Sequence, residues 1–66
     1  MMRTKYSNDQ VRDMLEDWRE RNFKPSYVVI AERTGLTYSY VVGWKNKDRK
    51  MGQRALNKIV NFIVEN

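Results

Sequence analysis

The apolar residues of this chain recur at the three- and four-residue spacing of α-helices. One stripe consists of Val11, Met14, Leu15 and Trp18, at positions i, i+3, i+4 and i+7. A second stripe near the C-terminus is built in the same way, and its members are Leu56, Ile59, Val60 and Ile63, widened by Ala55, Phe62 and Val64. No segment shows the alternation of a half-buried strand. The spacing therefore predicts a small all-α fold.

The first predicted helix has a recognisable start and an acidic side. Ser7 stands three residues before Gln10, the spacing of a capping box, so we expect a helix over about residues 8–22. At 100° per residue, five carboxylates fall opposite the apolar stripe. They are Asp9, Asp13, Glu16, Asp17 and Glu20. We expect this side to face solvent.

Two short helices are predicted in the middle of the chain. Pro25 interrupts the first helix, and Ser26 can cap a second one. Gly35 can end that second helix in the left-handed conformation. Thr37 can then cap a third helix over roughly residues 38–46.

A fourth helix is predicted over about residues 52–64, after a basic loop. Sixty-six residues leave room for one domain only. We therefore predict a basic N-terminal arm at residues 1–6 and a four-helix domain at residues 7–66, which contains a helix-turn-helix. Such a small core often needs additional stabilisation from disulfides, a metal ion or a partner subunit.

The residue types that are absent exclude several kinds of chemistry. The chain has no cysteine and no histidine, which excludes disulfides, the common zinc sites, thiol nucleophiles and a histidine proton shuttle. No phosphate-cradling glycine loop or nucleophile–base pair is visible either. We expect a protein that is not an enzyme and has no cofactor, no metal and no small-molecule substrate.

The basic residues are concentrated in one stretch. The formal net charge is +5, and the sequence pI is about 9.8. Six cations crowd the end of the third helix, the loop and the start of the fourth helix, with only Asp48 opposing them. They are Lys45, Lys47, Arg49, Lys50, Arg54 and Lys58. Such clustering predicts a polyanionic partner, although a merely solvated face is the alternative.

The third helix carries an unusual mixture of side chains on its outward face. Tyr40, Val41 and Trp44 form its inward face. The outward face combines an apolar valine and a tyrosine with polar residues, in the set Tyr38, Ser39, Val42, Gly43 and Asn46. We expect this face to be covered by a partner in the working state.

At these positions the chain resembles the phage repressor/Cro-like (lambda-repressor-like) helix-turn-helix family. The residues that carry the resemblance are Ile30-Ala31, Gly35-Leu36, Thr37, Val41 and Trp44-Lys45-Asn46, followed by RKMGQRALNKIVNFI. It covers roughly residues 10–64. Three positions depart from the family pattern: Lys47 replaces a frequent glycine, Thr34 a frequent aliphatic residue and Lys45 a common acid. The four predicted helices are also one fewer than the family's usual five.

The resemblance implies that the third helix lies in the major groove of duplex DNA. Its base-reading residues would be Thr37, Tyr38, Ser39, Val42, Gly43 and Asn46. The six clustered cations would bind phosphates. Gly43 would permit close approach to DNA or serve internal packing.

Further expectations concern the termini and the partner. Arg3 and Lys5 form a minor-groove arm or a disordered terminus. Phe62 and Val64 close the core or form the seam of a homodimer that binds paired half-sites. No stretch has the length of a signal peptide or a membrane span, so we expect a cytoplasmic protein that is nucleoid-associated when bound to DNA.

The predicted function is sequence-specific binding of double-stranded DNA by a transcriptional regulator of phage, plasmid or prokaryotic origin. With no room for an effector domain, it would act by occupying its site. Two alternatives remain open, since fold does not fix function. One is a protein–protein adaptor that binds an acidic host protein, and the other is a weakly specific architectural or recombination-accessory DNA binder.

Overall fold

The computed structural model describes residues 5–66, which form four α-helices and no strand. The helices are α1 (Asn8–Arg21), α2 (Tyr27–Thr34), α3 (Tyr38–Lys45) and α4 (Gln53–Glu65). The predicted all-α, four-helix fold is confirmed, and each predicted helix end lies within one residue of the observed one.

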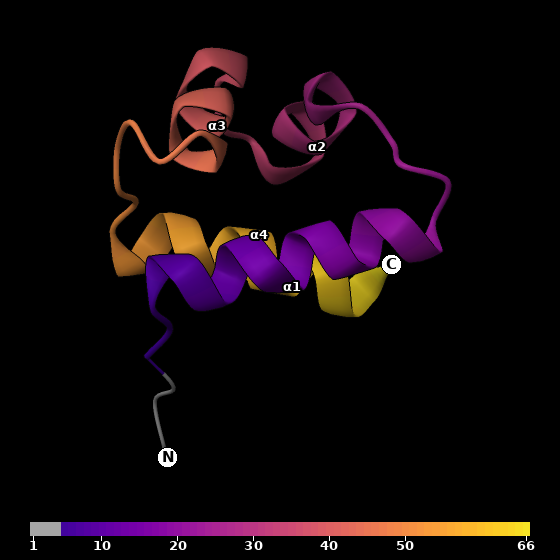
Figure 1. Ribbon diagram of the computed structural model, residues 1–66, viewed down its shortest axis with the longest axis horizontal. Helices are drawn as coiled ribbons and strands as arrows, with labels where there is room; N and C mark the ends of the chain where they lie inside the picture. The colour runs from indigo at the N-terminus through magenta and orange to yellow at the C-terminus, as the bar shows by residue number, and fades with distance from the viewer. Residues whose placement is uncertain (1–4) are drawn as a thin grey trace.

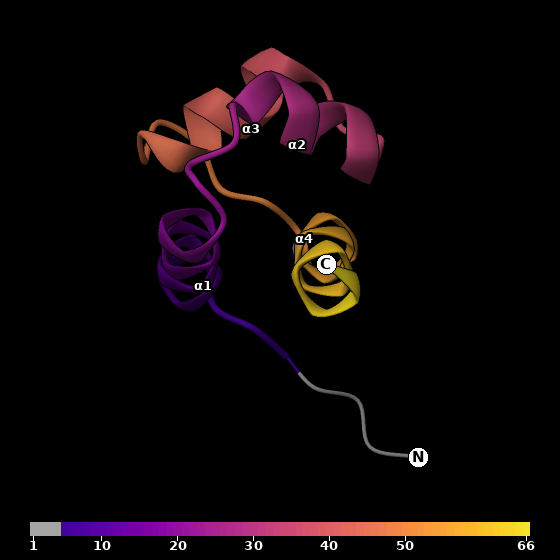
Figure 2. The same ribbon diagram turned by 90° about the vertical axis from the view of Figure 1, so that its right-hand side faces the viewer.

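The helices form two layers. α1 and α4 lie side by side and run in the same direction, while α2 and α3 lie across them as a second layer (Figures 1 and 2). The amino ends of the long helices are joined by hydrogen bonds between Tyr6 and Gln53, at 3.1 and 2.7 Å. Near their carboxyl ends, the rings of Trp18 and Phe62 meet edge to face, with centroids 4.8 Å apart.

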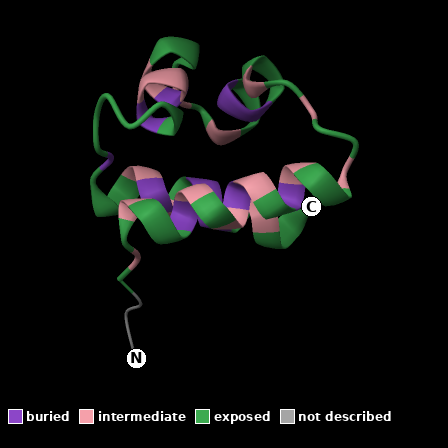
Figure 3. Ribbon diagram, in the orientation of Figure 1, coloured by how far each residue is buried: buried purple, intermediate pink, exposed green. Residues whose placement is uncertain are grey.

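The core fills the space between the two layers (Figure 3). All four helices and the loop before α4 contribute buried apolar side chains. They are Val11, Leu15, Trp18, Ile30, Ala31, Val41, Trp44, Met51, Leu56, Ile59, Val60 and Phe62. Both predicted stripes point into this core, with Met14, Ala55 and Ile63 partly buried at its edge. Val64, which the prediction added to the second stripe, is exposed instead. No helix within residues 5–66 is long and apolar enough to cross a membrane.

Side chains cap three of the helices at their amino ends, as predicted. Ser7 and Gln10 form the reciprocal capping box of α1. The hydroxyls of Ser26 and Thr37 accept hydrogen bonds from N–H groups in the first turns of α2 and α3. These bonds satisfy donors that the helix leaves open.

The ends of three helices are followed by a residue in the left-handed conformation. These residues are Phe23, Gly35 and Lys47, with φ of 64°, 79° and 67°. At Gly35 and Lys47 the chain folds back in the same way, because the next N–H bonds a carbonyl five residues earlier, at 3.0 Å in α2 and 2.8 Å in α3. Only one of the three positions is a glycine, which alone adopts this conformation without steric cost.

Asn8 fixes the position of α3 relative to α1. Its side-chain oxygen accepts hydrogen bonds from the indole N–H of Trp44, at 2.9 Å, and from the backbone N–H of Met51, at 2.7 Å. Its amide nitrogen donates to the Met51 carbonyl at 3.3 Å. One side chain thus joins the start of α1, the end of α3 and the loop before α4.

Candidate nucleic-acid interface

α3 is held firmly from its inner side. The side chains of Val41 and Trp44 are fully buried. From α1, the Arg12 guanidinium donates to the Trp44 carbonyl at 2.6 Å and lies 5.3 Å from the centre of the Trp44 ring. Arg12 is itself oriented by an ion pair with Asp9 at 2.7 Å. The opposite side of α3 therefore faces away from the core in a fixed orientation.

Three of the five residues predicted on the outward side of α3 are exposed. Tyr38 is 52% exposed, Ser39 and Asn46 are exposed, and Val42 is partly buried. Thr37 is also exposed, but its hydroxyl accepts the Tyr40 N–H at 3.3 Å and so serves first as the cap of α3. An α-helix with its side chains is about 10–12 Å across. That diameter fits a major groove about 12 Å wide.

Gly43 does not lie open on this side, because the Arg49 side chain covers it. A β-carbon added to Gly43 would lie 3.0 Å from Arg49 Nε, 3.2 Å from Cδ and 3.3 Å from Cγ. Of the two roles predicted for this glycine, internal packing is the one that the structure shows. In a helix, glycine costs about 1 kcal/mol relative to alanine, so helix stability does not explain a glycine at this position.

The six predicted phosphate-binding cations are all exposed, and they flank α3 on two sides. Lys45 and Lys47 lie toward α1, beside Arg12 and Tyr27. Arg54 and Lys58 lie on α4, where they border a shallow depression with Tyr40. Arg49 and Lys50 belong to the loop that connects the two groups. The cations thus form two groups, one on each side of α3, with the loop between them.

The cations near α3 have no carboxylate partner among residues 5–66, whereas four of the five acids of α1 are in ion pairs. Every ion pair in this part of the chain involves a carboxylate of α1: Arg12–Asp9, Arg19–Glu16, Arg21–Asp17 and Lys24–Glu20. In the whole sequence, basic and acidic residues balance outside residues 45–58. The full net charge of +5 thus belongs to the segment around the end of α3.

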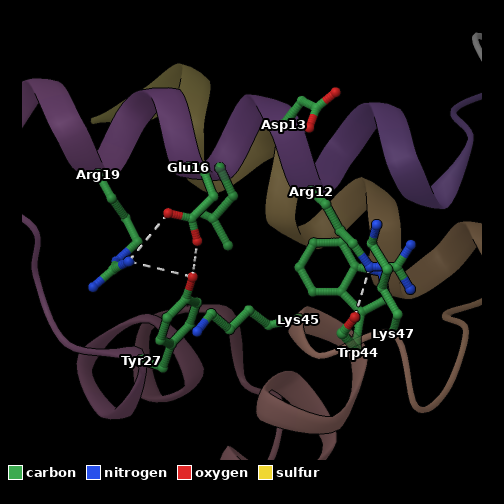
Figure 4. Close-up of a pocket in the computed structure, with 9 residues that line it drawn as sticks. Arg12, Asp13, Glu16, Arg19, Tyr27, Trp44, Lys45 and Lys47 are labelled. Carbon is green, nitrogen blue, oxygen red and sulfur yellow. Dashed lines mark hydrogen bonds and ion pairs between the residues drawn. The ribbon is translucent and has the colours of Figure 1, made fainter.

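A cavity of about 300 Å³ lies between α1 and the second layer, next to Lys45 and Lys47 (Figure 4). On its wall the Tyr27 hydroxyl donates to the Glu16 carboxylate, and the Arg19 guanidinium donates to both groups at 3.3 Å. Burial raises the pKa of Tyr27 to about 12, and the hydrogen bond and negative charge of Glu16 contribute to the rise.

This cluster corrects one prediction and adds residues that the sequence did not indicate. Glu16 was expected on the solvent side of α1, but it is partly buried and faces α2. The other four acids of that side are exposed. Tyr27 is also packed against Lys45, whose ammonium lies 5.3 Å from the ring centre. Tyr27 therefore links α1, α2 and the carboxyl end of α3.

The residues predicted for a dimer seam do not form one surface. Phe62 is only 7% exposed and packs against Trp18 in the core, whereas Val64 is 76% exposed. Of the predicted minor-groove arm, Lys5 is exposed, and Arg3 lies outside the described residues.

Comparison with family models, curated proteins and solved structures found no match for this chain. Within residues 5–66, no three acidic side chains come together in a way that could hold a metal ion.

Proposed function

We propose that this chain is a sequence-specific binding protein for double-stranded DNA, in which α2 and α3 act as a helix-turn-helix and α3 enters the major groove. The observation that carries the proposal is the combination at α3. A firmly anchored helix exposes Tyr38, Ser39 and Asn46, and cations without carboxylate partners flank it on two sides.

The exposed side chains suit the chemistry of base edges. The major groove displays hydrogen-bond donors, acceptors and thymine methyl groups in a pattern that differs for each base pair. The hydroxyls of Ser39 and Tyr38 can donate or accept, and the Asn46 amide can bond adenine or, at the helix end, a phosphate. Val42 offers an apolar contact for a thymine methyl.

The flanking cations supply affinity that does not depend on sequence. Each phosphate that a lysine or arginine neutralises releases counterions, so the slope of log K against log salt is about −0.9 per contact. Because the segment 45–58 holds the whole net charge, the salt dependence should come almost entirely from that segment.

The proposed role is transcriptional regulation by occupancy of a site. A single domain of this size that covers a half-site with α3 can block a polymerase or a competing factor without further machinery. A homodimer would place two copies of α3 on half-sites about 34 Å apart, on one side of the duplex.

Selection from a random duplex pool, with affinities measured over a salt series, tests this function. We expect an enriched, two-fold symmetric motif. Ser39→Ala should change the preferred bases, whereas Lys50→Ala should weaken all sequences about equally and reduce the salt slope by about 1. Equal behaviour of the two variants would exclude α3 as the reading element. A steep salt slope without enrichment would indicate an architectural DNA binder.

One observation favours a protein partner as a second candidate function. Phe23 is 99% exposed in the turn between α1 and α2, at the opposite end of the molecule from the loop before α4 (Figure 1). Its backbone has a φ of 64°, in the left-handed region that is uncommon for a bulky side chain. Absence of duplex binding at low salt would make this end the functional one.

A further inference from the structure

Arg49 is the loop residue that lies directly against α3. Its Cγ, Cδ and Nε atoms all lie within 3.3 Å of the position that a β-carbon on Gly43 would take. Gly43 has Ser39 and Asn46 as its neighbours at i−4 and i+3 on the helix surface. The arginine stem therefore lies along the flank of the outward side of α3.

The backbone from which this stem starts is also fixed. The Arg49 carbonyl accepts a hydrogen bond from the Arg12 guanidinium at 3.2 Å. One residue earlier, the Asp48 N–H donates to the Gly43 carbonyl at 2.8 Å. The loop is thus folded back on the end of α3, and the position of Arg49 beside the helix follows from it.

The guanidinium of Arg49 is free to bind a ligand. Arg12, Arg19 and Arg21 are each paired with a carboxylate. Arg49 is exposed, and its guanidinium has neither an ion pair nor a hydrogen bond within the described part of the chain. Its planar fork of donors is therefore available for a two-point contact, which a lysine cannot make.

We propose that Arg49 reads a guanine in the groove that α3 enters. Gly43 positions Arg49, because the missing side chain lets the arginine lie directly against the helix. The proposal rests on the proposed DNA-binding function and reassigns Arg49 from a phosphate contact to a base contact. Arginine binds the O6 and N7 atoms of guanine with two parallel hydrogen bonds, the commonest specific contact in the major groove. A side chain that lies along α3 enters the groove together with the helix.

The close contact with Arg49 also gives a reason for a glycine in the middle of α3. A β-carbon at 3.0–3.3 Å from three atoms of the stem would be tighter than ordinary contact, so the Arg49 side chain would have to move away from α3 by a few tenths of an ångström. Because Arg49 is exposed, the shift would not disturb the core. Alanine at this position should therefore keep the fold and change only where the guanidinium points.

The test is selection from a random duplex pool with the wild type and three variants. Arg49→Lys keeps the positive charge but lacks the paired N–H donors of the guanidinium. Gly43→Ala places a methyl group where the Arg49 side chain lies against the helix. Lys50→Ala is the matched control, since it removes a neighbouring charge from the same loop. Circular dichroism should show a thermal midpoint for Gly43→Ala that is equal to or higher than that of the wild type.

We expect one guanine position of the wild-type motif to lose about 5- to 150-fold of its selectivity in Arg49→Lys, which is the discrimination of about 1–3 kcal/mol per bidentate base contact converted to a ratio of affinities. Gly43→Ala should weaken selection at the same position, and Lys50→Ala should leave the motif unchanged while lowering affinity for all sequences. A wild-type motif that survives in Arg49→Lys would overturn the role of Arg49 and leave the proposed function standing. A wild type that enriches no motif would overturn both.

Discussion

Replacement of Lys47 by glycine should stabilise the fold while it weakens DNA binding. Lys47 follows α3 with a φ of 67°, in the left-handed region. Its N–H bonds the Trp44 carbonyl at 3.0 Å, a contact that glycine would keep. The exposed lysine side chain makes no ion pair within residues 5–66, so its loss should cost the fold little.

The size of the effect follows from the backbone. A left-handed conformation costs an L-residue about 1–2 kcal/mol, and glycine loses about 0.5–1 kcal/mol of additional chain entropy on folding. The net gain in the free energy of unfolding is the difference between these ranges, about 0–1.5 kcal/mol with a midpoint of about 0.75 kcal/mol. For a domain of this size, the midpoint gain raises the thermal midpoint by about 3–6 °C.

Lys47→Ala is the matched control, because it removes the same charge but keeps a β-carbon in the left-handed conformation. Urea unfolding of the wild type and both variants isolates the backbone term. On duplex DNA, both variants should show the same salt slope, smaller than that of the wild type by about 0.9. A Lys47→Gly variant that is no more stable than Lys47→Ala would refute the reasoning.

Three further predictions concern the core and its polar contacts. Asn8→Ala should lower the free energy of unfolding by about 1–3 kcal/mol, measured in urea, because the buried Trp44 indole loses its acceptor. The free energy of unfolding should fall between pH 10 and pH 12. The Tyr27 phenol loses its proton near pH 10 in the unfolded state, but only near pH 12 in the folded state. The unfolded state therefore binds fewer protons in that window, which favours unfolding as the pH rises. Urea unfolding across that window should show the loss in the wild type and not in Tyr27→Phe. Phe62→Ala should cost about 3–5 kcal/mol and leave little folded protein by circular dichroism, whereas Val64→Ala should stay within about 0.5 kcal/mol of the wild type.

The parts of the fold that sequence predicted depend on residues only a few positions apart. The Ser7 cap needs only Gln10, three residues later, and the turn after α2 needs only a glycine at position 35. Helical periodicity is equally local, and it placed both apolar stripes in the core. Such signals are readable because each helix fixes its own neighbours at i+3 and i+4.

The sequence did not predict contacts between distant segments. Asn8 and Trp44 are separated by 36 positions, and Arg12 and Trp44 by 32. A helical wheel places Glu16 on the acidic side of α1, but it cannot show that α2 brings the Tyr27 hydroxyl to that point. The contact of Arg49 with Gly43 could not be predicted from the sequence either, because it depends on how the loop folds back onto α3.

The separation of charge is a property of the fold as much as of the sequence. Along α1, pairs at i+3 and i+4 place arginines beside carboxylates, and the turn after it adds the pair of Lys24 with Glu20. These surface pairs contribute little stability, but they compensate the acidic side of the molecule locally. The uncompensated cations are then left on the loop and helix ends around α3. Asp13 and Glu16 nevertheless line the same cavity as Lys45 and Lys47, so a polyanion that approaches α3 from the α1 side meets these two carboxylates together with the two lysines.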